Sequence, residues 1–195
     1  MSIIKVKPPY KPLVQLPYCC VPCGLQWILF RRGYWVDQEE IAQYCKMKIL
    51  KSYAKAFVRK MIIAKSKDDT GTSPYKFHIY ANKLLKAKRI PLTIQKYQVS
   101  QVKDPTQLIV KNLKAGYDVM LDFACKPFPE YEYDEGGHVV VVSEFDTDKG
   151  VLTIGDPSWI HAKFWKVPLK KIVNAMDKKY DGFERGFWVV KPKTL

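Results

Sequence analysis

Three of the chain's five cysteines lie within five residues of one another, at positions 19, 20 and 23. A thiolate can act as a nucleophile, bind a metal ion or exchange electrons with a second thiol. The spacing of Cys20 and Cys23 suits a zinc or iron–sulfur site, but structural zinc normally takes four ligands and the chain has no second pair of this kind. The same spacing suits a redox pair, although the expected strand–helix–strand context is lacking. A nucleophilic cysteine is the interpretation that the rest of the chain favours.

The cysteine cluster lies where a helix is predicted to begin. Pro22 suits the first turn of a helix because its missing N–H has no intrahelical partner there, and Gly33 is a natural terminator. A helix over 22–32 places Cys19 and Cys20 at its N-terminus. The unpaired N–H groups and the helix dipole at such an end stabilise a thiolate.

A catalytic thiol also needs a base and a group that orients the base. His138 begins a valine-rich strand over 138–145, a turn follows, and a second strand runs over 151–154 towards Asp156. The two strands are predicted to pair as a hairpin. Simple register about the turn puts position 138 opposite 155–158, which brings the Asp156 carboxylate within reach of the imidazole.

The remaining candidates have structural interpretations. His78 lies in a lysine-rich amphipathic helix and is expected at its surface or boundary, and His161 has no obvious orienting partner in the sequence. Cys45 and Cys125 are interpreted as small buried hydrophobic residues. Trp159, which follows Asp156 closely, could shield a His–Asp hydrogen bond from water.

Four short motifs follow one another along the chain. They are Gln15, Cys20-Val-Pro-Cys-Gly-Leu-Gln-Trp-Ile-Leu29, Gly137-His138-Val-Val-Val-Val142 and Gly155-Asp156-Pro157. Taken in this order, they resemble the C39-like branch of the papain-like cysteine peptidases. In that branch a Gln precedes a helix start of the Asp-Cys-Gly-Pro-Ala type, and a Gly-His strand and an Asp-Pro step follow.

The resemblance implies a papain-like fold and gives each motif a role. Cys20 would be the nucleophile and His138 the general base and acid. Asp156 would be the orienting carboxylate. Gln15 would donate to an oxyanion hole beside the backbone N–H of Cys20. No metal ion or cofactor is expected.

This chain departs from the family pattern around the nucleophile. Cys19 and Val21 stand where the family usually has Asp and Gly, and Gln15 lies five residues before Cys20, where six is commoner. Cys19 would be four residues from Gln15 and Cys23 eight, which leaves Cys20 the best fit. Cys23 and Cys19 remain the alternative nucleophiles.

The resemblance favours cleavage of a peptide or related amide bond. The same triad could transfer the acyl group to an amine or thiol, which would make the protein an acyltransferase. A function of another class is a basic binding module for nucleic acid or an acidic partner, with an inert cysteine site. The sequence does not indicate the oligomeric state.

Charge is the strongest bulk property of the chain. Lys and Arg number 33 against 19 Asp and Glu, a formal net charge of +14. Basic residues crowd the segment 46–89, which is predicted to be helical. Such a segment can attract nucleic acid or an acidic peptide substrate, although no nucleic-acid-binding motif accompanies it.

The predicted order of elements defines the fold class. Helices come first and a mainly antiparallel sheet follows, which indicates an α+β fold in a single domain over 1–195. The expected helices cover 22–32, 37–45, most of 46–64, 73–89, 105–116 and about 169–176, and the expected strands cover 92–99, 119–123, 138–145, 151–154 and 186–190.

Composition supports a globular protein. A chain of 195 residues with 47% hydrophobic residues can bury a sizeable core. It contains no apolar run of transmembrane length and no secretory signal pattern near residue 1, so a cytoplasmic location with reduced thiols is expected.

Overall fold

The structure of the protein is a computed structural model that describes residues 2–131, 136–158, 163–180 and 182–193. The strands are β1 (Ile3–Lys5), β2 (Lys48–Ile49), β3 (Ile62–Ile63), β4 (Leu92–Gln98), β5 (Asp118–Ala124), β6 (Gly137–Asp146), β7 (Val151–Asp156), β8 (Lys163–Pro168) and β9 (Gly186–Pro192). The α-helices are α1 (Cys20–Arg31), α2 (Gln38–Tyr44), α3 (Phe77–Ala87), α4 (Pro105–Lys114) and α5 (Leu169–Ala175). Short 3-10 helices are η1 (Lys51–Ala56), η2 (Lys67–Asp69), η3 (Val99–Gln101) and η4 (Pro129–Tyr131).

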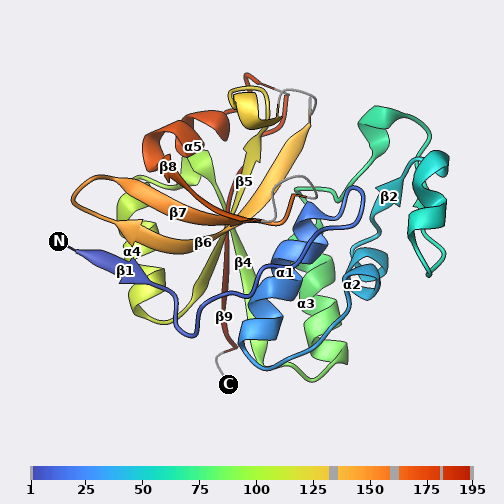
Figure 1. Ribbon diagram of the computed structural model, residues 1–195, viewed down its shortest axis with the longest axis horizontal. Helices are drawn as coiled ribbons and strands as arrows, with labels where there is room; N and C mark the ends of the chain where they lie inside the picture. The colour runs from blue at the N-terminus through green and yellow to red at the C-terminus, as the bar shows by residue number, and fades with distance from the viewer. Residues whose placement is uncertain (1, 132–135, 159–162, 181, 194–195) are drawn as a thin grey trace.

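One antiparallel sheet forms the centre of the fold. Its strand order is β4-β9-β5-β6-β7-β8, and β1 adds to β6. All seven residues of β5 are buried, as expected for a central strand that is covered on both faces. Helices α1 and α3 lie on one side of the sheet, and α4 and α5 lie on the other (Figure 1). The α+β papain-like fold class predicted from the sequence is confirmed.

Most of the predicted elements are present. The first helix begins at Cys20, two residues earlier than predicted, and ends beside Gly33, whose positive φ of 83° suits glycine. Helix α2 has Asp37 as its N-cap, as predicted. The predicted hairpin is the β6–β7 pair, with a register shift between Val142 and Glu144. Strands β1 and β8 were not predicted, because β1 is short and β8 mixes lysines with aromatic residues.

The helical prediction for 46–64 is wrong. This stretch contains a parallel pair of two-residue strands, β2 and β3, with η1 between them. Met47 and Ile49 are buried on alternate positions, which is the period of a strand rather than of a helix. The apolar side chains of this stretch form a small core with Cys19 instead of the stripe of an amphipathic helix.

A buried charge cluster anchors the C-terminal end of α1. Asp118, at the start of β5, accepts hydrogen bonds from Arg31 Nε at 2.5 Å, Arg32 Nε at 2.6 Å and Tyr10 Oη at 2.6 Å. Its side chain is fully buried. Paired in this way, the carboxylate ties α1 to the sheet and so fixes the direction in which the helix presents its other end.

Within the described ranges, no helix combines the length and the apolar composition needed to cross a membrane.

Candidate active site

The three clustered cysteines point into three different environments. Cys19, the residue before α1, is fully buried, and its Sγ lies 3.6 Å from Met47 Sδ. Cys23 is also fully buried and donates from Sγ to the carbonyl oxygen of Leu13 at 3.4 Å. Burial raises the pKa of both thiols well above the ordinary value. Cys20 is the member of the cluster that is partly exposed.

Cys20 lies at the first position of α1. The Cys19 side chain makes no capping hydrogen bond to this helix end. The first N–H groups of α1 therefore receive no hydrogen bond from the cap side chain. Helix α1 runs down from this point towards Arg31 (Figure 1).

His138 is the second residue of β6, and its ring lies between a carboxylate and a thiol. Its Nε2 lies 2.7 Å from Asp156 Oδ1. The Cys20 side chain lies close enough to the ring to help raise its pKa. Because Nε2 is occupied by Asp156, Nδ1 is the nitrogen that remains for Cys20. The structure thus brings together Cys20, His138 and Asp156 in the order that the sequence predicted.

The electrostatics of the pair favour a charged ring. Burial lowers the pKa of His138, but the Asp156 charge and the hydrogen bonds to Asp156 and Cys20 outweigh it and raise the pKa to about 10. Burial raises the pKa of Asp156, and the charge and hydrogen bond of His138 outweigh it, so the net pKa is lowered. The arrangement is that of an imidazolium between an ionised carboxylate and a thiol.

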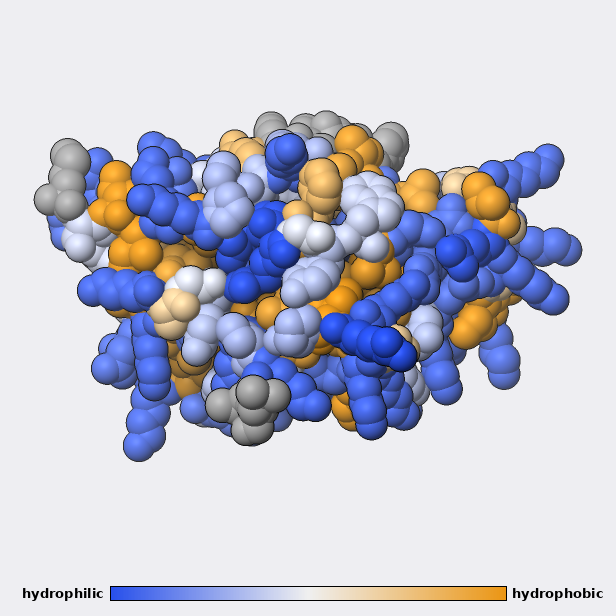
Figure 2. Space-filling model, turned by 90° about the horizontal axis from the view of Figure 1, so that it is seen from below, coloured by the Kyte–Doolittle hydropathy of each residue, from blue (hydrophilic) through white to orange (hydrophobic). Residues whose placement is uncertain are grey.

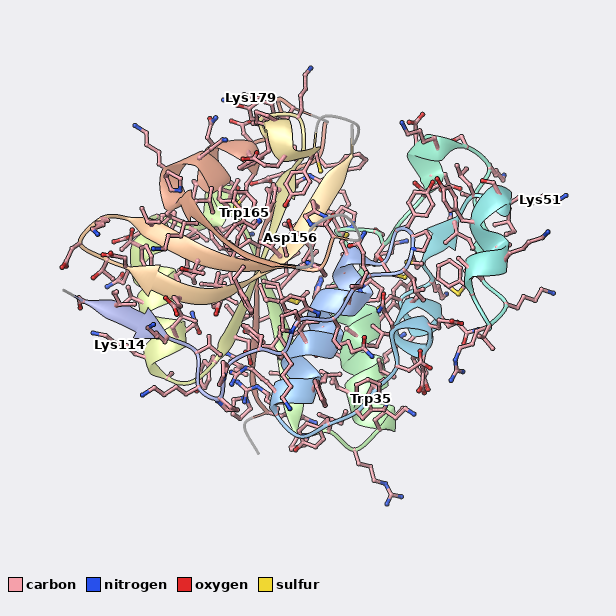
Figure 3. The ribbon with its side chains drawn as sticks, viewed as in Figure 1. Trp35, Lys51, Lys114, Asp156, Trp165 and Lys179 are labelled. Atoms are coloured by element: carbon pink, nitrogen blue, oxygen red, sulfur yellow. The ribbon has the colours of Figure 1, made fainter. Side chains whose placement is uncertain are left out.

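Three further groups hold the Asp156 carboxylate. Tyr131 Oη donates to Oδ2, Trp165 Nε1 donates to Oδ2 at 3.2 Å, and the Ser158 backbone N–H donates to Oδ1 at 2.9 Å. Figure 3 shows Trp165, from β8, beside Asp156. The Tyr131 ring also packs against His138, with centroids 4.8 Å apart. These contacts orient the carboxylate and shield it from water.

The sequence did not place Tyr131 or Trp165 beside Asp156. Tyr131 lies 25 residues from Asp156 and in no motif. Trp165 lies on β8, a strand that was not predicted and that pairs with β7. The shielding role expected of Trp159 falls outside the described residues. The only signal in the sequence was the density of aromatic residues between 123 and 165.

Gln15 lies beside the loop that carries Asp156. Its backbone N–H donates to the carbonyl oxygen of Pro157 at 2.9 Å, and its side chain is half-buried. Among the described residues, Gln15 Oε1 is a buried oxygen without a hydrogen-bond partner.

Gln38, at the start of α2, holds the loop on both sides of Gln15. Its Oε1 accepts from the Leu16 N–H at 2.7 Å, and its Nε2 donates to the Val14 carbonyl oxygen at 3.1 Å. The side chain therefore acts as a two-point clamp on the backbone around Gln15. No feature of the sequence indicates this role, because a Gln after a helix cap is an ordinary surface residue.

The other cysteines and histidines lie apart from this site. Cys45 and Cys125 are buried, as predicted, and burial raises the pKa of Cys45 to about 12. His78 is half-buried on α3, and burial and the charge of Lys96 lower its pKa. His161 is outside the described residues. Across the described ranges, no three His, Cys, Asp or Glu side chains gather as a metal site would require.

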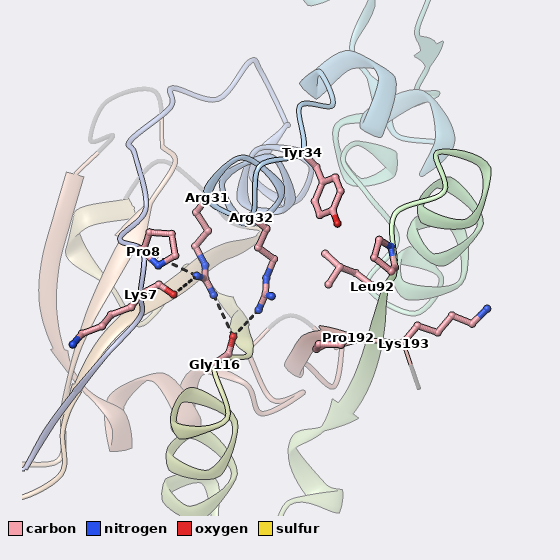
Figure 4. A pocket seen from close by; sticks show the side chains of 10 residues that line it. Lys7, Pro8, Arg31, Arg32, Tyr34, Leu92, Gly116, Pro192 and Lys193 are labelled. Carbon is pink, nitrogen blue, oxygen red and sulfur yellow. Dashed lines mark hydrogen bonds between the residues drawn. The ribbon is translucent and has the colours of Figure 1, made fainter. Parts of the chain in front are cut away.

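A basic cavity of about 640 Å³ lies at the opposite end of α1. Arg31, Arg32 and Gly116 line it, and hydrogen bonds from both arginines to the Gly116 carbonyl oxygen cross its wall (Figure 4). Helix α1 separates it from Cys20 by roughly 16 Å, given its rise per residue. This cavity is distinct from the cysteine site.

Comparison with known proteins identifies the family of the chain. The sequence profile of the peptidase C39-like family matches residues 7–185, and the chain belongs to that family. This membership supports a cysteine peptidase-like function. No curated protein sequence matches the chain.

Solved structures share the fold at low sequence identity. A Bacillus anthracis protein assigned to the C39-like peptidases has a TM-score of 0.63 and 17% identity, with 100% of both chains covered. The peptidase domain of Streptococcus ComA, a bifunctional ABC transporter of a quorum-sensing pathway, has a TM-score of 0.54 and 16% identity. That match covers 94% of this chain and 99% of the other. The likeness supports the papain-like fold.

Proposed function

We propose that this protein is a cysteine peptidase that cleaves a peptide or related amide bond. Cys20 is the nucleophile, His138 the general base and acid, and Asp156 the carboxylate that orients the ring. Gln15 donates to the oxyanion hole with the Cys20 backbone N–H. The observation that carries this assignment is the chain of contacts from Cys20 through His138 to Asp156.

In the first half of the reaction, the enzyme forms an acyl intermediate. An imidazolium beside a thiol favours the thiolate, which is the nucleophile. Cys20 Sγ attacks the carbonyl carbon, and the negative charge moves to the carbonyl oxygen, where the Cys20 N–H and the Gln15 amide stabilise it. The C–N bond then breaks as His138 gives its proton to the leaving amine, which leaves a thioester on Cys20.

In the second half, water resolves the thioester. The neutral His138 ring takes a proton from water as the oxygen attacks the thioester carbon. The C–S bond breaks, the carboxylic acid leaves, and Cys20 and His138 return to the thiolate–imidazolium pair. Asp156 stays ionised throughout and holds the ring through Nε2.

The test of this proposal is cleavage of a peptide library, with new termini read by mass spectrometry. We expect Cys20→Ala to lower the rate of cleavage by about a thousandfold or more. Cys23→Ala is the matched control, because it removes a thiol one turn along the same helix, and it should retain most of the activity. Loss of activity in Cys23→Ala with full activity in Cys20→Ala would overturn the assignment.

The same experiment separates a hydrolase from an acyltransferase. Both enzymes would form the thioester on Cys20, but they differ in what takes the acyl group. A hydrolase gives a free carboxylate in the presence of added amines, whereas an acyltransferase gives the amide in preference. Our proposal predicts the carboxylate as the main product.

A further inference from the structure

A basic arm projects from the fold beside the proposed site. We define the basic arm as residues 46–71, which include β2, η1, β3 and η2. It forms the right-hand lobe of Figure 1, next to the N-terminal end of α1. The arm has eight Lys and Arg residues against two acidic residues, Asp68 and Asp69, of which Asp69 pairs with Lys48.

The arm is built onto the segment that leads into Cys20. Its own small core contains Cys19, the residue before the proposed nucleophile, together with Met47, Ile49, Phe57, Met61 and Ala42. Tyr53 of the arm packs edge-on against Tyr18, with ring centroids 5.5 Å apart. Tyr18 has a positive φ of 63°, a conformation that tertiary packing must hold in place for an aromatic residue. The arm and the nucleophile segment are therefore one packed unit.

Hydrogen bonds also fix the outer part of the arm. The carboxylate of Glu39, a buried residue of α2, accepts from the backbone N–H of Val58 at 3.1 Å and of Arg59 at 2.6 Å. Gln43 Nε2 donates to the Lys60 carbonyl oxygen at 3.0 Å. The tip of the arm is thus held in a fixed position by hydrogen bonds to α2.

This anchored surface is both apolar and cationic. Val58 is 97% exposed, and Ile62 and Ile63 of β3 are each 46% exposed. The lysines at 51, 55 and 60 of the same arm are also exposed. In Figure 2, which views the molecule from below, hydrophobic side chains lie between the hydrophilic ones that project from the right-hand end. Exposed aliphatic side chains on an anchored, positively charged surface are typical of an interaction site.

The edge of β3 suits an extended occupant. In the described part of the chain β3 pairs with β2 alone, so its other edge is open to a further strand. Ile62 and Ile63 point to opposite faces of β3. A peptide strand that added to this edge could place aliphatic side chains against one of them and acidic side chains towards the lysines of the arm. Nucleic acid fits less well, because the one exposed aromatic residue of the arm, Tyr53, already packs against Tyr18, and aliphatic groups offer no stacking platform for bases.

From these observations we infer that the basic arm docks an acidic, aliphatic-containing segment of the substrate, outside the part that reacts at Cys20. This inference rests on the proposed peptidase function. Docking at the arm should stabilise the bound substrate and the transition state by the same free energy, so it should lower KM and leave kcat unchanged.

Direct binding tests the inference without catalysis. The probe is a fluorescein-labelled peptide of alternating Glu and Val, titrated with the full-length Cys20→Ala protein, and the counterpart has Gln in place of Glu. We expect the Glu–Val peptide to bind about tenfold or more tightly than the Gln–Val peptide, and its affinity to fall as salt is added. Equal binding of the two peptides would overturn the inference.

Charge reversal locates the surface. Lys51→Glu combined with Lys55→Glu should weaken binding of the Glu–Val peptide by about tenfold, because each change replaces an attraction by a repulsion. Lys111→Glu combined with Lys114→Glu is the matched control on α4, across the molecule from Lys51 (Figure 3), and should leave the affinity unchanged. Equal losses in both pairs would mean a general charge effect and would contradict docking at the arm. Tighter binding of single-stranded DNA than of the Glu–Val peptide would also overturn the inference.

Kinetics separate the two proposals. A cleavable peptide that carries a Glu–Val extension should have a lower KM than the same peptide with a Gln–Val extension, at the same kcat. If both are cleaved with equal KM, the docking inference fails and the peptidase proposal stands. If the Glu–Val peptide binds at the arm and no peptide is cleaved, the peptidase proposal fails.

Discussion

His138 lies between two groups whose charges set its pKa. Burial alone would lower this pKa, but Asp156 and Cys20 raise it to about 10. The ring is therefore a cation at neutral pH. The stabilisation that this gives to the fold is complete below the ordinary pKa of 6.5 and is lost as the pH rises through about 10. For Asp156, whose pKa is lowered, the stabilisation is present above the ordinary value of 3.8 and is lost as the pH falls below it.

The first prediction concerns the alkaline limit of activity. In the wild-type protein kcat/KM should fall as the pH rises through about 10, because the ring then loses the proton that the leaving amine needs. In Asp156→Asn the charge that raises the His138 pKa is gone, so the fall should occur at lower pH. The measurement is kcat/KM from neutral to strongly alkaline pH. Asp177→Asn, an exposed carboxylate, is the control, and an alkaline limit that Asp156→Asn does not shift would contradict the account.

At the scale of elements, α2 positions the loop that carries Gln15. Gln38 binds the backbone on either side of Gln15 through two hydrogen bonds. The Gln15 amide would act on charge that develops in the transition state. In the proposed reaction Gln38 would therefore be a positioning residue, because its effect on the reaction would pass through Gln15.

The second prediction tests this clamp. Gln38→Leu keeps the size of the side chain but removes both hydrogen bonds, so kcat should fall about tenfold or more while KM changes little. The matched control is Gln107→Leu, at an exposed glutamine of α4, which should leave kcat unchanged. Thermal unfolding of both variants shows whether the fold is kept. Equal kcat in Gln38→Leu and the wild type would mean that the clamp has no part in the reaction.

Local patterns in the sequence predicted the elements that carry the triad. Pro22 and Gly33 marked α1, and a valine-rich run, a turn and a second apolar run marked the β6–β7 hairpin, so the sequence could predict that Cys20, His138 and Asp156 lie close together. The contacts of Tyr131 and Gln38 could not be predicted, because they join segments distant in sequence. The Trp165 contact could not, because β8 was not recognised as a strand. The arm was mistaken for a helix because its buried positions follow a strand period over stretches too short to recognise.

At the scale of the whole molecule, the two ends of α1 have different roles. The Cys20 end faces the site, and the Arg31 end is held by Asp118. Buried pairs of this kind are costly to break, because the partner is left as an uncompensated charge. The anchor should therefore affect stability and leave the chemistry of the folded protein unchanged.

The third prediction follows from this separation. Asp118→Asn should lower the free energy of unfolding by about 3–5 kcal/mol, because Arg31 and Arg32 lose their shared counter-charge. The alkaline limit of activity should stay where it is in the wild type, since His138 keeps its partners. Urea unfolding gives the first quantity and the pH profile the second. A shifted pH profile in the folded variant would show that the two ends of α1 are coupled.

The distribution of charge over the molecule is also a feature that the sequence predicted only in part. The composition and the crowding of lysines were plain from the sequence, with a formal net charge of +14. The sequence did not show that the lysines of the arm belong to a unit attached to the segment before Cys20, because this attachment depends on the core that Cys19 shares with the arm. Taken alone, a basic segment indicates a solvated surface. In the fold, this segment packs against the residues that lead into Cys20.

The central claim is that one thiol is activated by one histidine, and its most direct test is the rate of alkylation of each cysteine. The wild-type protein is treated with iodoacetamide at about pH 6, and mass spectrometry follows the modification of all five cysteines. The account predicts that Cys20 is modified first, and that His138→Ala slows its modification about tenfold or more. Slow and equal modification of all five cysteines, or a Cys20 rate that His138→Ala leaves unchanged, would contradict it.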